Sequence, residues 1–237
     1  MHDTAMQIGS MFMRNYLSGR PGRLLDLGGM NVNGSLRSVA PEHSFYCGAD
    51  LSAGNGVDVV IEGGGALPFS DGVFDAVVSS SCFEHDPLFW CTFAEMVRVT
   101  RPGGYVYINT PSNGEVHRYP LDCWRFYPDS GVALELWAAR GGTPVRLIES
   151  MIAPRRTDQW NDCILVFGRE ASAPAQLICD GLPGAMHVRR HDRKDVLATE
   201  AKLTEDQRLL RQYRARLTAI KGVPPFGRAK PTRDVLP

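Results

Sequence analysis

The chain has 237 residues and a formal net charge of zero, because 26 Lys and Arg balance 26 Asp and Glu. Apolar residues make up 43% and charged residues 22% of it, which excludes a fully disordered chain, a collagen-like repeat and a small disulfide scaffold. No apolar run approaches the ~20 residues of a membrane-spanning helix. The length indicates one or two domains, and the neutral total argues against a protein that coats nucleic acid.

The first half of the chain predicts one helix followed by a series of buried strands. Met6, Phe12 and Met13 belong to an apolar face that predicts a helix over 4–18, before the break at Pro21 and Gly22. Short apolar runs then alternate with turns and longer segments. Because these runs are apolar throughout, they indicate strands covered on both faces, as in a parallel sheet. The predicted strands are 23–27, 44–49, 57–61, 74–79 and 105–109.

Two helices and a hairpin complete the predicted sheet domain. Asp86 as a cap and Pro87 at the first helical position predict a helix that ends before the turn at 101–104. A second helix over 128–140 ends at the following pair of glycines. The apolar runs 145–152 and 162–167 have no helix between them and predict an antiparallel hairpin. The fold class is therefore an α/β sandwich with a mostly parallel seven-stranded sheet and one antiparallel strand.

The composition changes after residue 170, which suggests three regions: an N-terminal helix over 1–20, a main domain over 21–170 and a C-terminal arm over 171–237. Residues 171–186 look like a linker, and Thr204 with Gln207 forms a capping box. An amphipathic helix over 205–220 follows; its apolar residues are Leu209, Leu210, Tyr213, Leu217 and Ile220. The arm carries 13 Lys and Arg against 7 Asp and Glu. This basic excess predicts that the arm docks on the acidic main domain, within a subunit or across a homodimer.

The six cysteines are scattered and form no C-x-x-C pair. Several lie in apolar runs, where a free Cys behaves as a small hydrophobic residue. This usage predicts reduced thiols in a cytoplasmic protein and no zinc cluster.

A glycine pair and an acid mark the ends of the first two predicted strands. Gly28 and Gly29 follow the first strand directly, where glycine lets the backbone come close to a ligand. Asp50 ends the second strand, 24 residues after Asp26, at the place where ribose hydroxyls are bound in such sheets. A tight strand-to-helix turn and a turn cap would explain the same residues without a ligand.

Four blocks in this order and spacing resemble the class I S-adenosylmethionine-dependent methyltransferases: LLDLGG, GADLS, ALPFSDGVFDAVVSSSCFEH and EMVRVTRPGGYVYINTPS. The resemblance covers roughly residues 22–169 and implies a Rossmann-like sandwich. Met30 and Val32 stand where the family usually has its second and third glycines. A subgroup with an N-V-N-G-S loop and an HRYPxDCWRFYPD segment is similar in this respect.

The resemblance also implies which residues hold S-adenosylmethionine. Gly28 and Gly29 would approach its methionine part, Asp26 its amino group and Asp50 its ribose hydroxyls. The adenine would lie against the backbone of residues 66 and 67, with Glu62 as a partner of its amine. Ser80 ends the fourth strand at the crevice, where open α/β sheets bind ligands. The full predicted set is Asp26, Gly28, Gly29, Asn31, Asp50, Leu51, Glu62, Ala66, Leu67 and Ser80.

Methyl transfer to an alcohol requires a base during attack. His85, His117 and Asp122 are the candidates, with a structural role as the alternative for each. In some quinone-type relatives a Glu-His segment helps to hold a divalent cation, and Glu84 with His85 has these ligand types. Two adjacent ligand types do not make a site, so no metal is predicted.

The segment 110–128 is long for a connection and opens onto the crevice, and long loops are often functional. It resembles a bacterial subgroup whose members often accompany enzymes of glycan or natural-product glycosylation. The predicted acceptor-binding residues are Arg118, Trp124 and Arg125, together with Trp160 from the turn at 158–162. The alternative is structural: Arg125 would pair with Asp122, and Trp124 would seal the sheet.

The leading hypothesis is a methyltransferase that uses S-adenosylmethionine, yields S-adenosylhomocysteine and O-methylates a sugar or a glycosylated natural-product precursor. The alternatives are N- or carboxyl-methylation of a small metabolite, and a non-catalytic partner protein that keeps the fold. The missing G-x-G-x-x-G disfavours a dinucleotide-dependent oxidoreductase. The predicted partner is a small acceptor, neither a nucleic acid nor a membrane.

Overall fold

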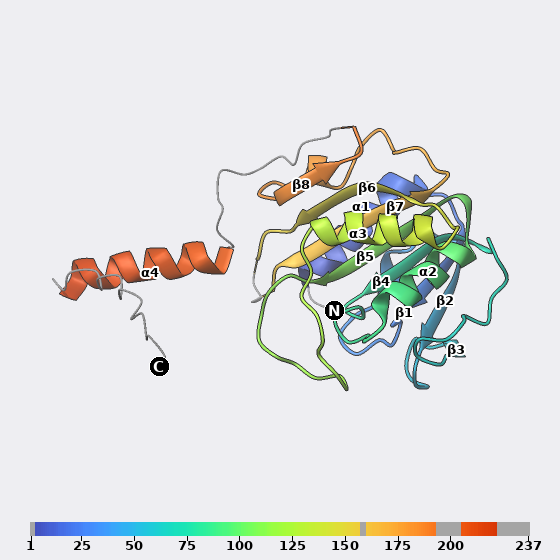
Figure 1. Cartoon of the computed structure of the whole chain (residues 1–237), viewed down its shortest axis with the longest axis horizontal. Helices are drawn as coiled ribbons and strands as arrows, with labels where there is room; N and C mark the ends of the chain where they lie inside the picture. Colours follow the sequence, from blue (N-terminus) through green and yellow to red (C-terminus); the bar gives the residue numbers. More distant parts are fainter. Residues whose placement is uncertain (1–2, 157–159, 193–204, 222–237) are drawn as a thin grey trace, which may run out of the picture. The chain divides into compact units, whose positions relative to one another are not determined.

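The computed structural model describes residues 3–156, 160–192 and 205–221. The chain divides into a large unit, Met1–Ala198, and a small one, Thr199–Pro237. The large unit contains an eight-stranded sheet with the order β3-β2-β1-β4-β5-β7-β6-β8 (Figure 1). Its strands are β1 (Arg23–Leu27), β2 (Phe45–Asp50), β3 (Val59–Val60), β4 (Phe74–Ser80), β5 (Thr100–Pro111), β6 (Arg146–Ile152), β7 (Asp162–Arg169) and β8 (Met186–Arg190).

The sheet is parallel in one half and mixed in the other. Strands β3, β2, β1, β4 and β5 run parallel, so their carboxyl ends meet at one edge, as the sequence predicts. Strand β7 is antiparallel to both β5 and β6, which confirms the predicted closing hairpin. Strand β8 is antiparallel to β6, so the sheet has two reversed strands instead of the predicted one.

The predicted number of seven strands is wrong because β8 comes from the segment assigned to the arm. Residues before it are anchored to the main domain: the backbone N–H groups of Ile178 and Cys179 donate to the Glu149 carboxylate at 2.7 and 2.9 Å, and the Tyr16 hydroxyl donates to it at 2.5 Å. Leu177, Ile178 and Leu182 are buried. Apolar burial thus binds residues 171–192 to the sheet, in spite of their linker-like composition.

Helices cover both faces of the sheet (Figure 1). Helices α2 (Phe89–Val99) and α3 (Asp129–Arg140) pack on one face through residues such as Phe93 and Leu134. Helix α1 (Asp3–Leu17) and the short 3-10 helix η1 (Leu36–Val39) cover the other face, where Phe12 and Leu36 are fully buried. The burial of β1, β2, β4 and β5 between these layers explains why their sequences are largely apolar, whereas the edge strand β3 is partly exposed. A second short 3-10 helix, η2, spans Cys179–Gly181.

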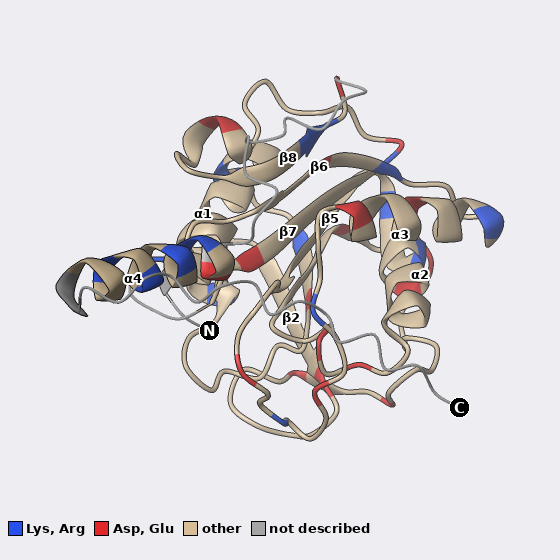
Figure 2. Ribbon diagram, turned by 60° about the vertical axis from the view of Figure 1, so that its left-hand side comes forward, with Lys and Arg blue, Asp and Glu red and all other residues tan. Residues whose placement is uncertain are grey.

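The small unit contains helix α4 (Glu205–Lys221), at the position where the sequence predicts a helix. Its basic residues are visible as blue segments of the ribbon (Figure 2). Leu210, Tyr213 and Leu217 lie along one face of α4 and are exposed. The predicted cap Thr204 and the ranges 193–204 and 222–237 fall outside the described residues. Within the described residues, the structure shows no helix long and apolar enough to cross a membrane.

Candidate functional site

A cavity of about 620 Å³ opens at the carboxyl ends of β1, β2 and β4. This size is typical of small-molecule sites, and this edge of a parallel sheet is where α/β folds bind ligands. The lining comes from the turns after β1, β2 and β4, the segment 61–67, the start of α2 and the loop after β5. The side chains and backbone that line it include Gly28, Met30, Asp50, Leu51, Glu62, Leu67, Ser80, Cys82, His85, Asp86, Glu95, His117, Arg118 and Tyr119.

Gly28 lets the backbone of the first turn form one wall of the cavity. Its φ of 76° lies in the left-handed region, and a Cβ there would lie 2.7 Å from the Cβ of Cys82. The N–H groups of Gly28 and Gly29 both donate to the Ala49 carbonyl, at 2.9 and 3.2 Å. The turn after β1 is therefore held against the end of β2, so both turns face the same ligand.

Asp50 caps the turn, as one of its two predicted roles requires, and it also lies at the cavity. Its Oδ2 accepts from the backbone N–H of Met30 at 3.1 Å, and its Oδ1 accepts from Leu51 N–H at 2.7 Å. Asp50 also lines the cavity, and each carboxylate oxygen keeps a second lone pair for a ligand hydroxyl. It thus fixes the turn and faces the space where ribose is expected.

Four residues of the predicted cofactor set do not line the cavity: Asp26, Gly29, Asn31 and Ala66. Asp26 is buried and accepts a hydrogen bond from the Tyr46 hydroxyl at 2.7 Å. Burial raises its pKa to about 7. Asn31 accepts from the Gly34 N–H at 2.9 Å, and Gly29 packs against Gly48. Asp26, Gly29 and Asn31 thus support the turns that line the cavity without lining it themselves.

The other predicted cofactor residues, Leu51, Glu62, Leu67 and Ser80, line the cavity. Leu67 donates its backbone N–H to Glu95 Oε2 at 2.7 Å, which fixes the segment expected beside adenine. The hydroxyl of Ser80 is buried and has no hydrogen-bond partner among the described residues. An unpartnered buried hydroxyl at a cavity is costly, and a bound ligand would satisfy it.

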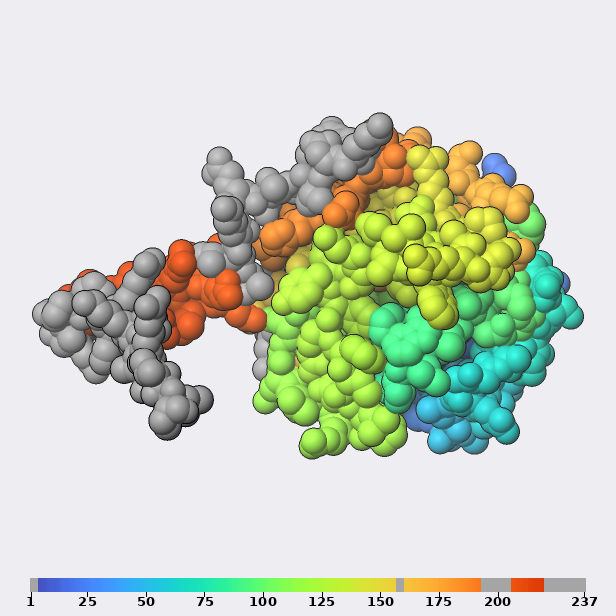
Figure 3. All heavy atoms as spheres, viewed as in Figure 1, coloured from blue at the N-terminus to red at the C-terminus, as the bar shows by residue number. Residues whose placement is uncertain are grey.

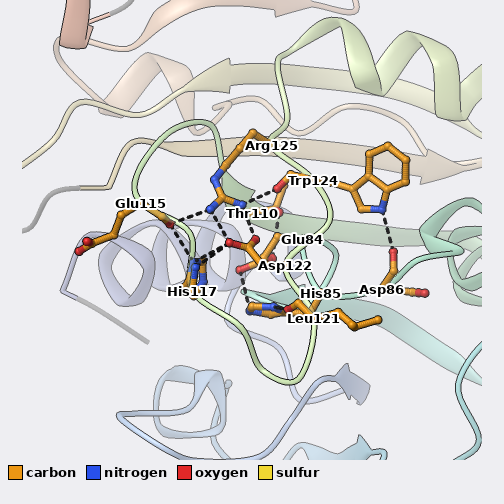
Figure 4. A network of polar contacts seen from close by, with 10 residues as sticks. All are labelled: Glu84, His85, Asp86, Thr110, Glu115, His117, Leu121, Asp122, Trp124 and Arg125. Carbon is orange, nitrogen blue, oxygen red and sulfur yellow. Dashed lines mark hydrogen bonds and ion pairs between the residues drawn. The ribbon is translucent and has the colours of Figure 1, made fainter.

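The acid–histidine pair after β4 meets the loop after β5 in a polar network (Figure 4). Nδ1 of His85 lies 2.5 Å from the Leu121 carbonyl oxygen, and its Nε2 lies 3.7 Å from Glu84 Oε1. Glu84 is 1% exposed and accepts from the Thr110 hydroxyl at 3.1 Å; burial raises its pKa to about 7. The rings of His85 and His117 lie with their centroids 4.9 Å apart, and both residues line the cavity.

Asp122 holds His117 in place and does not line the cavity. Its Oδ2 accepts from the backbone N–H of His117 at 2.7 Å, and Arg125 binds both carboxylate oxygens at 2.5 and 2.8 Å. The Arg125 guanidinium holds the pKa of Asp122 well below its usual range. Asp122 therefore stays ionised at neutral pH, and the geometry favours a positioning role over its predicted role as a base.

Of the predicted acceptor-binding residues, only Arg118 lines the cavity. Arg125 is engaged by Asp122 and by the carbonyl of Glu115 at 2.8 Å, as the structural alternative predicts. Trp124 donates its indole N–H to the Asp86 carbonyl at 3.0 Å. The Trp160 ring lies 4.7 Å from the His117 ring, while residues 158 and 159 of the same turn fall outside the described residues. In the space-filling view, the loop after β5 is light green, and its surface lies against the blue-green segment that follows β4 (Figure 3).

Sequence reasoning missed most of the turn between β4 and α2. Cys82, Asp86, Leu88 and Thr92 all line the cavity, and Ser81 turns the chain there with a φ of 53°. The signal was present, because this turn follows the carboxyl end of a central strand. Only its acid–histidine pair was considered.

The charges of the lining favour a cationic ligand. Four acids line the cavity, namely Asp50, Glu62, Asp86 and Glu95, of which Glu95 pairs with Arg98. Among the described residues of the lining, Arg118 is the only lysine or arginine. A pyrophosphate would be repelled by such a wall, and a sulfonium or ammonium group would be attracted to it. This contrast argues against the dinucleotide-dependent alternative.

Comparisons with known proteins agree with this geometry. Residues 23–108, from β1 into β5, match the model of a family described as a methyltransferase domain. An uncharacterized methyltransferase of Mycobacterium tuberculosis (strain H37Ra) is 32% identical over 118 residues, which cover 45% of this chain and 46% of that protein. The chain therefore matches about half the length of this curated relative.

Two solved structures share the fold at low sequence identity. The Burkholderia thailandensis 1,6-didemethyltoxoflavin-N1-methyltransferase, solved with 1,6-didemethyltoxoflavin and S-adenosylhomocysteine, has a TM-score of 0.55 and 17% identity, covering 71% of this chain and 79% of that one. The [4+2]-cyclase SpnF has a TM-score of 0.51 and 14% identity, covering 70% and 82%. Together the comparisons show a Rossmann-like fold and a match of residues 23–108 to a methyltransferase-domain family.

Proposed function

We propose that this protein is an S-adenosylmethionine-dependent methyltransferase that O-methylates a small, sugar-containing acceptor. The cavity at the carboxyl ends of β1, β2 and β4 carries the proposal, because it combines a close backbone approach at Gly28, an acid at Asp50 and an acidic lining. Fold alone would not suffice, since one fold supports several chemistries.

The residues present fit this cofactor. Asp50 would accept hydrogen bonds from the ribose, and Leu51 and Leu67 provide apolar contacts on either side of the base. Ser80, whose buried hydroxyl lacks a partner, is placed to bond to the cofactor or the acceptor. The bound cofactor supplies an electrophilic methyl group on a cationic sulfur, so the protein must chiefly position the acceptor and exclude water.

The acceptor side of the cavity is formed by the loop after β5. His117 and Tyr119 of this loop lie beside His85 of the turn after β4, with ring centroids 4.9 and 6.5 Å from that of His85, and Arg118 also lines the cavity. Such a combination of hydrogen-bonding groups and an aromatic ring suits a polyol. An acceptor hydroxyl must lose its proton during transfer, and His85 and His117 are the groups that can assist this loss.

We infer that the protein acts in the cytoplasm, in line with its six free cysteines.

Calorimetry with S-adenosylmethionine, S-adenosylhomocysteine and NAD tests the cofactor assignment. The wild-type protein should show saturable binding of the first two and none of NAD. Asp50→Ala should bind at least about 10-fold more weakly, because lost bonds to a buried ligand are worth ~1–3 kcal/mol. Asp71→Ala is the matched control, since this exposed acid pairs with Arg98 outside the cavity. Absence of saturable binding by the wild type would overturn the proposal.

A screen with labelled cofactor against sugars, aminosugars and carboxylic acids tests the acceptor class. Label in a base-stable sugar ether supports O-methylation. Label in an amine or a base-labile ester would replace it by the N- or carboxyl-methylation alternatives. Cofactor binding without transfer to any class would favour the non-catalytic alternative.

A further inference from the structure

Three side chains with metal-binding groups converge at the acceptor end of the cavity. Glu84 and His85 come from the turn after β4, and His117 comes from the loop after β5. One ligand atom of each lies within 4.8 Å of those of the other two. His85 and His117 line the cavity, and Glu84 is buried beside them. His117 comes from a different segment and reaches Glu84 and His85 only in the folded chain. The sequence therefore could not predict the cluster from the adjacent pair Glu84 and His85.

The orientation of His85 leaves a lone pair aimed at this cluster. Its Nδ1 lies 2.5 Å from the Leu121 carbonyl oxygen, and a carbonyl oxygen can only accept, so Nδ1 carries the proton. In the neutral form of the ring Nε2 then carries the lone pair, and it lies 3.7 Å from Glu84 Oε1. Two electron-pair donors face each other at a distance too long for a hydrogen bond. A cation between them would bind both.

Glu84 accepts hydrogen bonds from the Thr110 hydroxyl and from its own backbone N–H. Its Oε2 accepts from Thr110, while Oε1 faces His85. The nearest guanidinium, that of Arg125, is engaged by both oxygens of Asp122. A carboxylate that is 1% exposed is costly to keep ionised without a paired charge, and a bound metal ion would supply it.

His117 is held from behind by a carboxylate, as metal-binding histidines commonly are. Its Nδ1 lies 3.5 Å from Asp122 Oδ2, and its backbone N–H donates to the same oxygen. Arg125 fixes Asp122 in turn, and Trp160 packs on the His117 ring. The ring is thereby directed toward His85 and Glu84 (Figure 4).

We propose that Glu84, His85 and His117 form a binding site for a divalent transition-metal ion, with an open coordination position facing the cavity. Two imidazoles and one carboxylate suit Zn²⁺, Co²⁺ or Fe²⁺ better than Mg²⁺ or Ca²⁺, which prefer oxygen ligands. The catalytic role of the metal ion rests on the proposed function, because the acceptor hydroxyl would occupy the open coordination position of the ion. Coordination lowers the pKa of a bound hydroxyl, so its proton passes to solvent. The oxygen–methyl bond then forms as the methyl–sulfur bond breaks, and the metal charge is unchanged.

Titration of the full-length, tag-free and EDTA-treated protein with Co²⁺, followed by calorimetry and visible absorption, tests the site without any acceptor. The wild type should bind one equivalent, with bands typical of a four- or five-coordinate nitrogen and oxygen site. Thiolate charge-transfer bands would instead indicate binding by one of the six free cysteines and would overturn the proposal. Lack of stoichiometric binding would overturn it equally.

Variants locate the ligands. His117→Ala and Glu84→Gln should each weaken Co²⁺ binding by at least about 10-fold. Replacing a residue that only holds a metal ligand in place already lowers metal affinity by about this factor. His43→Asn is the control, because this exposed histidine lies on the loop between η1 and β2 and does not belong to the cluster. Asparagine tolerates the φ of 64° at this position. Unchanged binding in His117→Ala would overturn the site. S-adenosylhomocysteine binding, measured on the same samples, separates the two proposals: cofactor binding without metal binding removes only this inference, and the reverse removes only the proposed function.

Discussion

The two sides of the cavity are built by different means. The side at the ends of β1 and β2 is shaped by backbone: a left-handed glycine, two N–H groups on one carbonyl and a capping acid. The side formed by the loop after β5 is held by side chains, chiefly Asp122 and Arg125. Backbone turns require particular residues at particular positions, whereas a side-chain network can exchange its members. The first side is therefore readable from a motif, and the second is not.

The largest effect is expected on the backbone side. In Gly28→Ala the new Cβ would lie 2.7 Å from the Cβ of Cys82, at a φ of 76°. The turn must shift to relieve this contact, and a displacement near 1 Å costs ~100-fold in a positioned site. We expect the rate of methyl transfer to fall by about this factor and cofactor binding in calorimetry to weaken.

Gly142→Ala separates crowding from backbone strain, because Gly142 has a φ of 79° but nothing within 4 Å of the added Cβ. It should lose ~1 kcal/mol of unfolding free energy and bind the cofactor as the wild type does. If both variants bound equally well, the backbone of Gly28 would not form the cofactor wall.

A smaller effect is expected on the side-chain side. Arg125→Met leaves the Asp122 carboxylate, 2% exposed, without its partner. Because Arg125 itself is partly exposed, we expect a loss of ~2 kcal/mol in unfolding free energy, below the 3–5 kcal/mol of a fully buried pair. The KM for the acceptor should rise while the cofactor Kd stays constant.

The double variant Asp122→Asn, Arg125→Met is the control for this pair, since it removes the unpaired charge and should recover part of the lost stability in urea unfolding. A cofactor Kd that changed as much as the acceptor KM would show that the two sides of the cavity are not independent.

The last effect concerns pH and is spread over several pH units. Burial raises the pKa of Asp26 to about 7, against ~3.9 in an unfolded chain. A raised native pKa stabilises the fold fully below pH ~4, and this contribution is lost as the pH rises through 7. Asp26→Asn should therefore flatten the fall of unfolding free energy between pH 4 and 7 by up to about 1.4 kcal/mol per pH unit.

Urea unfolding at several pH values measures this difference. Asp58→Asn is the control with the opposite sign, because the Gly48 N–H holds the pKa of Asp58 below its usual value. That variant should be less stable than the wild type by a constant amount above pH ~4, and this deficit should shrink as the pH falls below 4. Parallel wild-type and Asp26→Asn curves would contradict the raised pKa.

The sequence predicted the parallel half of the sheet well. Strand β1 has the predicted limits, β4 is one residue longer and β2 is shifted by one residue at both ends, because apolar runs bounded by turn residues leave few alternatives. Strand β3 is shorter and β5 longer than predicted. Strand β8 was missed, since its pairing with β6 depends on long-range anchors such as Glu149. Likewise, the sequence allowed Arg125 either to bind the acceptor or to pair with Asp122. The contacts of the folded loop show the pairing.

The order of the strands also bears on how the sheet ends. One edge strand, β3, is two residues long, and the other, β8, carries Arg189 and Arg190. Long, flat and uncharged edges are templates for pairing with another chain, and short or charged edges resist it. Strand β8 thus covers β6 and ends the sheet with ion-paired arginines, Arg189 with Asp129 and Arg190 with Asp180 and Asp192, and this charged edge should keep the protein from aggregating edge to edge.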